Sequence, residues 1–263
     1  MKKNWKALVA IAAVVIIVAV AVVLINLRPR DQAAQPEPSS DSSIVAGKFG
    51  FPVSKIKIGE GGTKKAGDGR IPIGYSGTCD SAAQAAANYA PLMRDVNLKT
   101  WEAQKRTLTE VSKPGSWFSS ATLSGDIMAG LKEQPPGAFE GGWVQRADVP
   151  AGGMYRLASC EEKKRAVVQV FIGSLDGRTD SLPLANYGTL TMELAWDGDW
   201  KITDAMPRVD DSTFGGRVKD AGPSGQNPEG PTGSIPLLSS AAVDWVFEDV
   251  SREGWIEYAN AKR

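Results

Sequence analysis

Histidine is absent from all 263 residues of this chain. Without an imidazole, one chain cannot carry out Ser-His-Asp or Cys-His catalysis, and it cannot form the usual zinc sites that contain histidine. A pH switch centred on imidazole is excluded as well. No other catalytic motif is present, so the sequence predicts neither catalytic residues nor a bound metal or cofactor.

Cysteine is scarce, because the chain contains only Cys79 and Cys160. Two sulfurs alone make a poor metal site. Outside the cytoplasm, a disulfide between them would close a loop of about eighty residues, to which the chain-entropy model assigns about 4–5 kcal/mol. Two unpaired buried thiols are the alternative, and the sequence favours the disulfide.

An excess of basic charge is also lacking. The 30 Lys and Arg residues balance the 30 Asp and Glu residues, but five basic residues and no acidic ones lie within the first 30 positions. The remainder of the chain therefore has five more acidic than basic residues. This balance argues against a nucleic-acid partner bound through a basic face.

Charged residues, glycine and proline are missing from a run of 19 residues at positions 7–25. A helix of that length spans the hydrocarbon core of a bilayer, which is about 30 Å thick. The alternative is a cleaved signal peptide, but such peptides have apolar stretches of about 7–15 residues and end at a small-x-small site. We predict an uncleaved transmembrane helix at residues 7–27 that contacts the lipid bilayer.

The orientation of this helix follows from the charges on either side of it. More basic residues precede the run than follow it, namely Lys2, Lys3, Lys6, Arg28 and Arg30. The positive-inside rule then predicts a cytoplasmic N-terminus at residues 1–6. The protein is expected to cross the cell membrane once, with its C-terminal domain outside the cytoplasm.

Composition divides the rest of the chain into four parts. Residues 28–69 begin with a polar, Pro-rich stretch and are predicted to form a disordered stalk with a short edge segment. Residues 70–210 carry the folded domain, and residues 211–236 are a Gly/Pro-rich linker. Residues 237–263 are apolar enough that we expect them to pack back on the domain.

Helical patterns precede strand patterns within the predicted domain. An alanine-rich run at residues 82–90 predicts the first helix, and two more are predicted at 98–111 and 118–131. The apolar period then changes to two, which predicts strands that include residues 166–172 and 187–196. The order of these elements predicts an α+β fold.

Tryptophan is the most prominent large side chain in the predicted domain. An Asp-Gly-Asp turn places Trp196 and Trp200 on two strands of a hairpin, where they are expected to form a cross-strand aromatic pair. The C-terminal segment contains Trp245, Trp255 and Tyr258, which we predict as the candidate interaction surface. Packing in the core is the alternative for any single tryptophan.

The chain resembles a known superfamily in the order of several short motifs. These are Gly74-Tyr75, the Ala-Ala-Ala-Asn-Tyr helix, Met154-Tyr155-Arg156-Leu157, Val167–Val170, Leu-Ala-Trp-Asp-Gly-Asp-Trp-Lys-Ile and Gly254-Trp255-Ile256-Glu257-Tyr258-Ala259. Over about residues 70–260 it resembles the cystatin-like cone of nuclear-transport-factor-two-like domains, and within these an actinobacterial membrane-anchored family. That resemblance implies N-terminal helices packed on a curved antiparallel sheet, after the transmembrane helix. It also implies a role like that of single-span assembly subunits of conjugation and type IV secretion machines.

Three functions are compatible with these observations. The first, which we favour, is a non-catalytic envelope protein that binds other envelope or secretion proteins, with a homo-oligomer left open. The second is a cell-wall glycan binder that uses exposed tryptophans. The third is a small-ligand pocket or carboxylate-dependent enzyme within the cone, for which Asp126, Glu140 and Glu193 are candidate general bases.

Overall fold

The computed structural model divides the chain into two compact units, residues 1–39 and 40–263. The first unit lies outside the residues whose structure is described. The described residues all belong to the second unit, and they are 45–95, 101–123, 143–178, 181–206, 218 and 221–263.

The described residues form an α+β structure, but the fold predicted from the sequence requires correction. No helix among them is both long and apolar enough to cross a membrane. The predicted transmembrane helix at residues 7–27 and the cytoplasmic residues 1–6 lie outside the described part of the chain. The described helices are few and short, the longest having 16 residues, and the sheet is mixed rather than antiparallel.

The main sheet has nine strands, and seven of them follow one path across it. Their order is β1 (Val45–Ala46), β2 (Pro52–Val53), β11 (Trp255–Glu257), β6 (Met154–Glu161), β7 (Arg165–Arg178), β8 (Leu184–Trp196) and β10 (Gly225–Pro231). The remaining two, β5 (Trp143–Asp148) and β9 (Trp200–Met206), pair with parts of β7 and β8. A separate hairpin consists of β3 (Lys64–Lys65) and β4 (Pro72–Ile73).

The mixed character of the sheet arises at one edge. β11 runs antiparallel to β6 but parallel to β2, with Glu257 opposite Val53. The C-terminal strand thus lies between an early strand of the domain and its central strands. This insertion joins residues about 200 positions apart, as shown by the bond from the Ser54 hydroxyl to the Glu257 carbonyl, and local sequence patterns do not indicate it.

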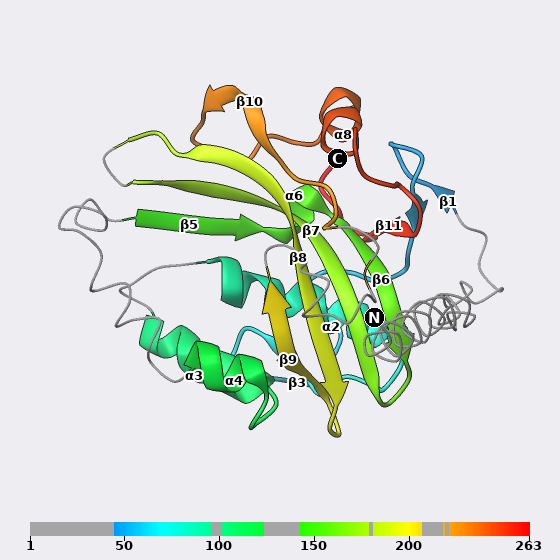
Figure 1. The fold of residues 1–263 in the computed structure, drawn as a ribbon, viewed down its shortest axis with the longest axis vertical. Helices are drawn as coiled ribbons and strands as arrows, with labels where there is room; N and C mark the ends of the chain where they lie inside the picture. The colour runs from blue at the N-terminus through cyan, green and yellow to red at the C-terminus, as the bar shows by residue number, and fades with distance from the viewer. Residues whose placement is uncertain (1–44, 96–100, 124–142, 179–180, 207–217, 219–220) are drawn as a thin grey trace, which may run out of the picture. The chain divides into compact units, whose positions relative to one another are not determined.

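Helices cover one face of the sheet, which we call the helix-covered face (Figure 1). They are α2 (Cys79–Arg94), α3 (Trp101–Val111) and α4 (Trp117–Leu123). The Thr78 hydroxyl caps α2 by accepting a hydrogen bond from the Ser81 amide. The small alanines of α2 let this helix pack closely on the sheet, where Val168 and Val170 are fully buried.

The opposite face of the sheet has a second apolar cluster. Because side chains alternate along β7, Phe171 points away from the helices while Val170 points toward them. Phe171 packs with Phe51, Phe247 and Trp255, which come from segments before and after the central strands. The short helix α8 (Ser240–Val246) contributes its buried side to this cluster.

The structure differs from the predicted division of the chain at the Gly/Pro-rich segment 211–236. Residues 225–231 of that segment form β10, which pairs with the first residues of β8. The register shifts between Gln226 and Pro231, so the strand is irregular, as expected of a proline-containing edge strand. Part of the segment predicted as a stalk, residues 45–69, also contributes strands β1, β2 and β3.

Candidate functional site

Two of the three residues predicted as an interaction surface lie in the core, so that prediction is wrong for them. Trp255 is 1% exposed, with its ring 5.9 Å from that of Phe247 and 5.1 Å from the Arg156 guanidinium carbon. Tyr258 is equally buried, and its hydroxyl donates to the Ala83 carbonyl at 3.3 Å. Burial raises the Tyr258 pKa well above its usual value. Both residues are buried because β11 pairs with β2 and β6 within the sheet, which places Trp255 and Tyr258 in the core.

Trp245 is the one predicted surface residue that the structure exposes, at 39%. It lies on α8, whose N-terminus is capped by the Ser239 hydroxyl accepting from the Ala242 amide at 3.1 Å. The ring lies against Gly225 of β10: a Cβ at that glycine would be 2.4 Å from the ring atom Cη2. Glycine at position 225 therefore lets the indole lie flush on β10 with its outer part in solvent.

Trp245 belongs to a group of exposed apolar side chains that we call the apolar rim. Among the described residues, five large hydrophobic side chains are exposed, and four of them make up the rim: Leu182, Leu184, Leu237 and Trp245. The fifth, Trp117, is at the start of α4, at the other end of this unit from α8 (Figure 1). Four of the five thus come from segments near β10, although alternation along β8 directs Leu184 toward the helix-covered side of the sheet, whereas α8, which carries Trp245, packs on the opposite face.

Hydrogen bonds join the segments that carry the apolar rim. Leu184 of β8 is paired with Pro231 of β10, and the Thr232 amide donates to the Pro183 carbonyl at 2.8 Å. The Tyr187 hydroxyl donates to the carbonyl of Pro236, the residue before Leu237. The rim is therefore built on paired backbone rather than on independent loops.

Acidic side chains surround Trp245 in sequence and form what we call the acidic loop. Its members are all exposed, namely Asp244, Glu248, Asp249 and Glu253. Arg252 is the single cation within residues 244–253, and its guanidinium lies 2.5 Å from the Asp244 carboxylate. Arg252 also lies over the rings of Phe51 and Phe247, which holds the loop against the core. The acidic loop keeps three negative formal charges.

Cys79 and Cys160 form a disulfide in the structure, with their Cα atoms 5.9 Å apart. The bond joins the first residue of α2 to the end of β6. It therefore fastens the main helix of the helix-covered face directly to the sheet.

Trp196 and Trp200 lie directly opposite each other on β8 and β9, with ring centroids 5.4 Å apart. Trp200 is fully buried, and its indole nitrogen donates to the Ser81 hydroxyl at 3.1 Å. Asp199 in the turn between these strands accepts hydrogen bonds from the Gly74 and Tyr75 amides at 2.6 and 2.9 Å. The tryptophan pair and its turn thus stabilise the packing of residues 74–81, which lead into α2.

The carboxylates proposed as general bases do not form a reactive cluster in the described residues. Asp126 and Glu140 lie outside them. Glu193 is buried in an ion pair with Arg165, and it also accepts from the Thr203 hydroxyl at 2.8 Å. Among the described residues, no group of three or more potential ligands is placed to hold a metal ion.

Asp95 is a carboxylate that the sequence did not single out. It follows α2, and burial raises its pKa, while the hydrogen bond from the Ala147 amide lowers it. The side-chain amide of Gln104 donates to the backbone carbonyl of Asp95 at 2.7 Å. These contacts join the end of α2 to α3 and β5, which is a structural task for this residue.

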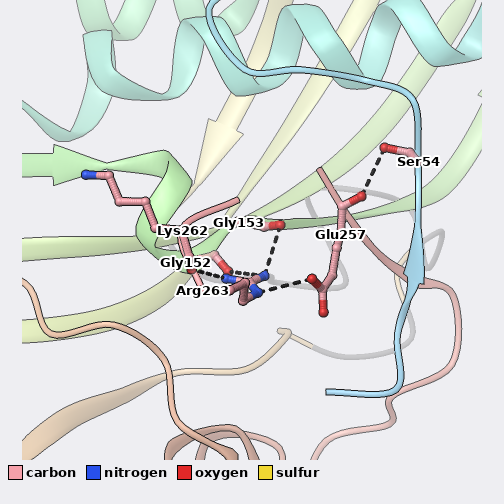
Figure 2. A network of polar contacts seen from close by, with 6 residues as sticks. All are labelled: Ser54, Gly152, Gly153, Glu257, Lys262 and Arg263. Carbon is pink, nitrogen blue, oxygen red and sulfur yellow. Dashed lines mark hydrogen bonds and ion pairs between the residues drawn. The ribbon is translucent and has the colours of Figure 1, made fainter. Parts of the chain in front are cut away.

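A polar network at the C-terminus was also missed by sequence reasoning (Figure 2). The Arg263 guanidinium lies 3.1 Å from the buried Glu257 carboxylate and also donates to the Gly152 and Gly153 carbonyls at 3.4 and 3.3 Å. A Cβ at Gly47 would be 2.8 Å from the same carboxylate, so glycine is needed there. The network fastens β11 to both α6 (Val149–Gly152) and the β1–β2 segment. No sequence motif marks an ion pair of this kind.

Comparisons of this chain with protein-family models, with curated proteins and with solved structures found no match. The likeness to conjugation and secretion subunits therefore stays a prediction from the sequence motifs. The site has to be interpreted from its own geometry.

Proposed function

We propose that this protein is a non-catalytic interaction protein of the cell envelope, which acts in a larger assembly. Its docking surface is the apolar rim, with Trp245 at the centre of the contact. The partner is a protein that presents apolar side chains of its own. Conjugation or secretion machinery is the setting that the sequence resemblance favours.

The exposed apolar rim is the observation that supports this function. Leu237 is 56% exposed and Trp245 39% exposed, although the same segments bury other large side chains efficiently. Soluble surfaces rarely gather large apolar side chains on a paired scaffold without a partner. Aromatic anchors surrounded by polar groups are typical of the centres of protein interfaces.

The disulfide supports a location outside the cytoplasm. Bonds such as Cys79–Cys160 persist in oxidising compartments and are rare in reducing ones. The expected attachment to the membrane can be tested separately by alkaline extraction of membranes followed by detection of the full chain. Recovery of the protein in the soluble fraction would remove membrane attachment from the proposal but would leave the docking surface in place.

Photo-crosslinking in cells tests the docking surface. A benzophenone amino acid replaces Trp245 in the full chain, and Trp117 is replaced in the control, because it is an exposed tryptophan away from the rim. We expect a discrete crosslinked species from position 245 and none from position 117. Equal labelling at both positions, or none at 245, would overturn the proposal.

A glycan-binding role is the competing hypothesis, and a separate binding experiment tests it. If purified peptidoglycan retains the full chain and Trp245→Ala abolishes that retention, the rim binds cell wall rather than protein. Retention that persists in Trp245→Ala would place any wall contact elsewhere on the molecule.

A further inference from the structure

The described surface has a basic region that complements the acidic loop. We call residues 55–70 the basic limb. It contains five exposed cations and two acidic residues: Lys55, Lys57, Lys64, Lys65, Arg70, Glu60 and Asp68. Its formal charge of three positive units equals that of the acidic loop in magnitude and is opposite in sign.

The described residues neutralise the charges of the basic limb only in part. Lys57 lies 3.5 Å from Glu60, and Arg70 lies 3.8 Å from Asp68. Lys64 and Lys65, which form β3, have no ion pair with any described residue, and both are exposed. Two adjacent lysines are thus available for a partner.

The basic limb is held rigidly on the domain. The Gly67 amide donates to the Glu110 carboxylate at 2.7 Å, and the Asn88 side chain accepts from the Gly59 amide at 2.7 Å. The Thr63 amide also bonds to the Ile73 carbonyl at 3.0 Å. The lysines of β3 therefore have a fixed position, which lowers the entropy cost of binding a partner.

The acidic loop offers the matching charges. Glu248 and Asp249 are exposed and have no ion pair with any described residue, whereas Asp244 is paired with Arg252. The indole of Trp245 lies on the same short stretch of chain. A lysine ammonium over such a ring gains a cation–π interaction in addition to the ion pairs.

One copy cannot bring the two surfaces together. Figure 1 places α8 and β3 at opposite ends of this unit. Two copies can do so if the basic limb of one meets the acidic loop of the next. A single such contact leaves a free basic limb at one end and a free acidic loop at the other, which a closed antiparallel pair, a ring or an open filament would each satisfy.

We propose that this protein self-associates head to tail, with the acidic loop and Trp245 of one copy binding Lys64 and Lys65 of another. The inference rests on the proposed function because it uses part of the same docking surface. The inference specifies that a second copy of this chain binds where the acidic loop meets Trp245. Opposite charges fix the orientation of the two copies and exclude a two-fold symmetric pairing of like surfaces.

Charge reversal in the full chain tests this contact by sedimentation velocity in a mild non-ionic detergent. The first variant is Glu248→Lys with Asp249→Lys, and the second is Lys64→Glu with Lys65→Glu. We expect concentration-dependent oligomers of the wild type that weaken as salt is raised. Each variant alone should associate at least about tenfold more weakly, because its two surfaces then carry like charges.

Mixing the two variants provides the decisive comparison, because their reversed surfaces complement each other. Association of the mixture should recover, chiefly through the unaltered basic limb of the first variant and the unaltered acidic loop of the second, which a variant that merely misfolds cannot produce. Arg106→Glu on α3 is the control, since this residue is exposed and belongs to neither surface, and it should leave association unchanged.

Three results would overturn the proposal: a monomeric wild type at every concentration, a mixture that fails to recover, or equal weakening by the control. A monomeric wild type that still crosslinks another protein through position 245 would leave the proposed function intact. If position 245 crosslinks only to a second copy, the self-association proposal is supported, and the proposal of a separate envelope partner is rejected.

Discussion

The two faces of the main sheet are stabilised in different ways. The helix-covered face is packed by one long, alanine-rich helix, and the disulfide fastens this helix to β6. The opposite face is covered by short segments from both ends of the domain. It also buries polar groups: Arg156, Gln169 and Thr191 occupy one register row across β6, β7 and β8.

The helix-covered face is formed by elements that local sequence patterns indicate. The opposite face also requires contacts between segments far apart in the sequence. The Arg156 side chain donates to the side-chain amide oxygen Oε1 of Gln169 at 2.7 Å, and Arg156 also packs on Trp255. The first contact forms within the β6–β7 hairpin, whereas the contact with Trp255 exists only after β11 has paired with β6. The opposite face therefore depends on its polar contacts being made together, and α8, which carries Trp245 of the apolar rim, packs on this face.

Loss of the disulfide, which joins the helix-covered face to β6, should produce the largest effect, because the crosslink restricts the unfolded chain. For the sequence separation of 81 residues, the double variant Cys79→Ala with Cys160→Ala is expected to lose about 4–5 kcal/mol of unfolding free energy. Chemical denaturation of the full chain measures this loss. Wild type treated with a reductant is the companion measurement, in case the variant does not fold. A loss under about 1 kcal/mol would contradict the chain-entropy account of this crosslink.

Breaking the Glu257–Arg263 pair should produce the largest loss on the opposite face. Arg263→Ala leaves a buried carboxylate without its counterion, and we expect a loss of about 2–4 kcal/mol in chemical denaturation. Lys262→Ala is the control, because its ion pair with Asp148 is more exposed and should contribute at most about 1 kcal/mol. Equal effects of the two variants would contradict the view that burial makes the Arg263 pair important.

Sequence patterns anticipated the α+β class and the individual elements of the helix-covered face. Alanine spacing indicated α2, and alternation along β8 with the Asp-Gly turn indicated the hairpin that carries Trp196 and Trp200. These signals are local, since each depends on residues a few positions apart. The hairpin register in particular follows from turn geometry.

The mixed edge and the true exposure of the C-terminal aromatics could not be predicted in this way. Trp255 and Tyr258 have the composition of an interface, but β11 inserts between β2 and β6 and buries them. Their burial depends on a partner strand about 200 residues earlier, which no periodicity reveals. The rim residues Leu182 and Leu237 were missed because a single exposed leucine has no sequence signature.

The stability of the protein should depend on pH through Asp95, the residue that follows α2. Burial raises the pKa of Asp95, so the folded protein binds more protons than the unfolded chain just above the unfolded pKa of about 3.9. The contribution of Asp95 to stability is therefore greatest in acid and declines as pH rises through the raised folded pKa. Asp95→Asn should remove this decline, because an amide does not ionise.

Thermal unfolding of wild type and Asp95→Asn across a pH series measures this effect. The asparagine oxygen can still accept the Ala147 amide, so the variant preserves the local hydrogen bond. Parallel pH profiles for the two proteins would show that Asp95 ionises as readily in the folded protein as in the unfolded chain.

The smallest change in stability is expected at the apolar rim, where two adjacent leucines provide the comparison. Leu237 is 56% exposed and Leu238 is 1% exposed, so the same substitution probes surface and core one residue apart. Leu237→Gln should change the unfolding free energy by less than about 0.5 kcal/mol, as at ordinary surface positions. Leu238→Gln should lose several times more, because large core side chains contribute about 2–5 kcal/mol. Crosslinking from position 245 should nevertheless fall in Leu237→Gln, because the rim loses an apolar contact. If Leu237→Gln destabilises the fold as strongly as Leu238→Gln, the rim belongs to the core of the opposite face, and its exposure no longer indicates a partner.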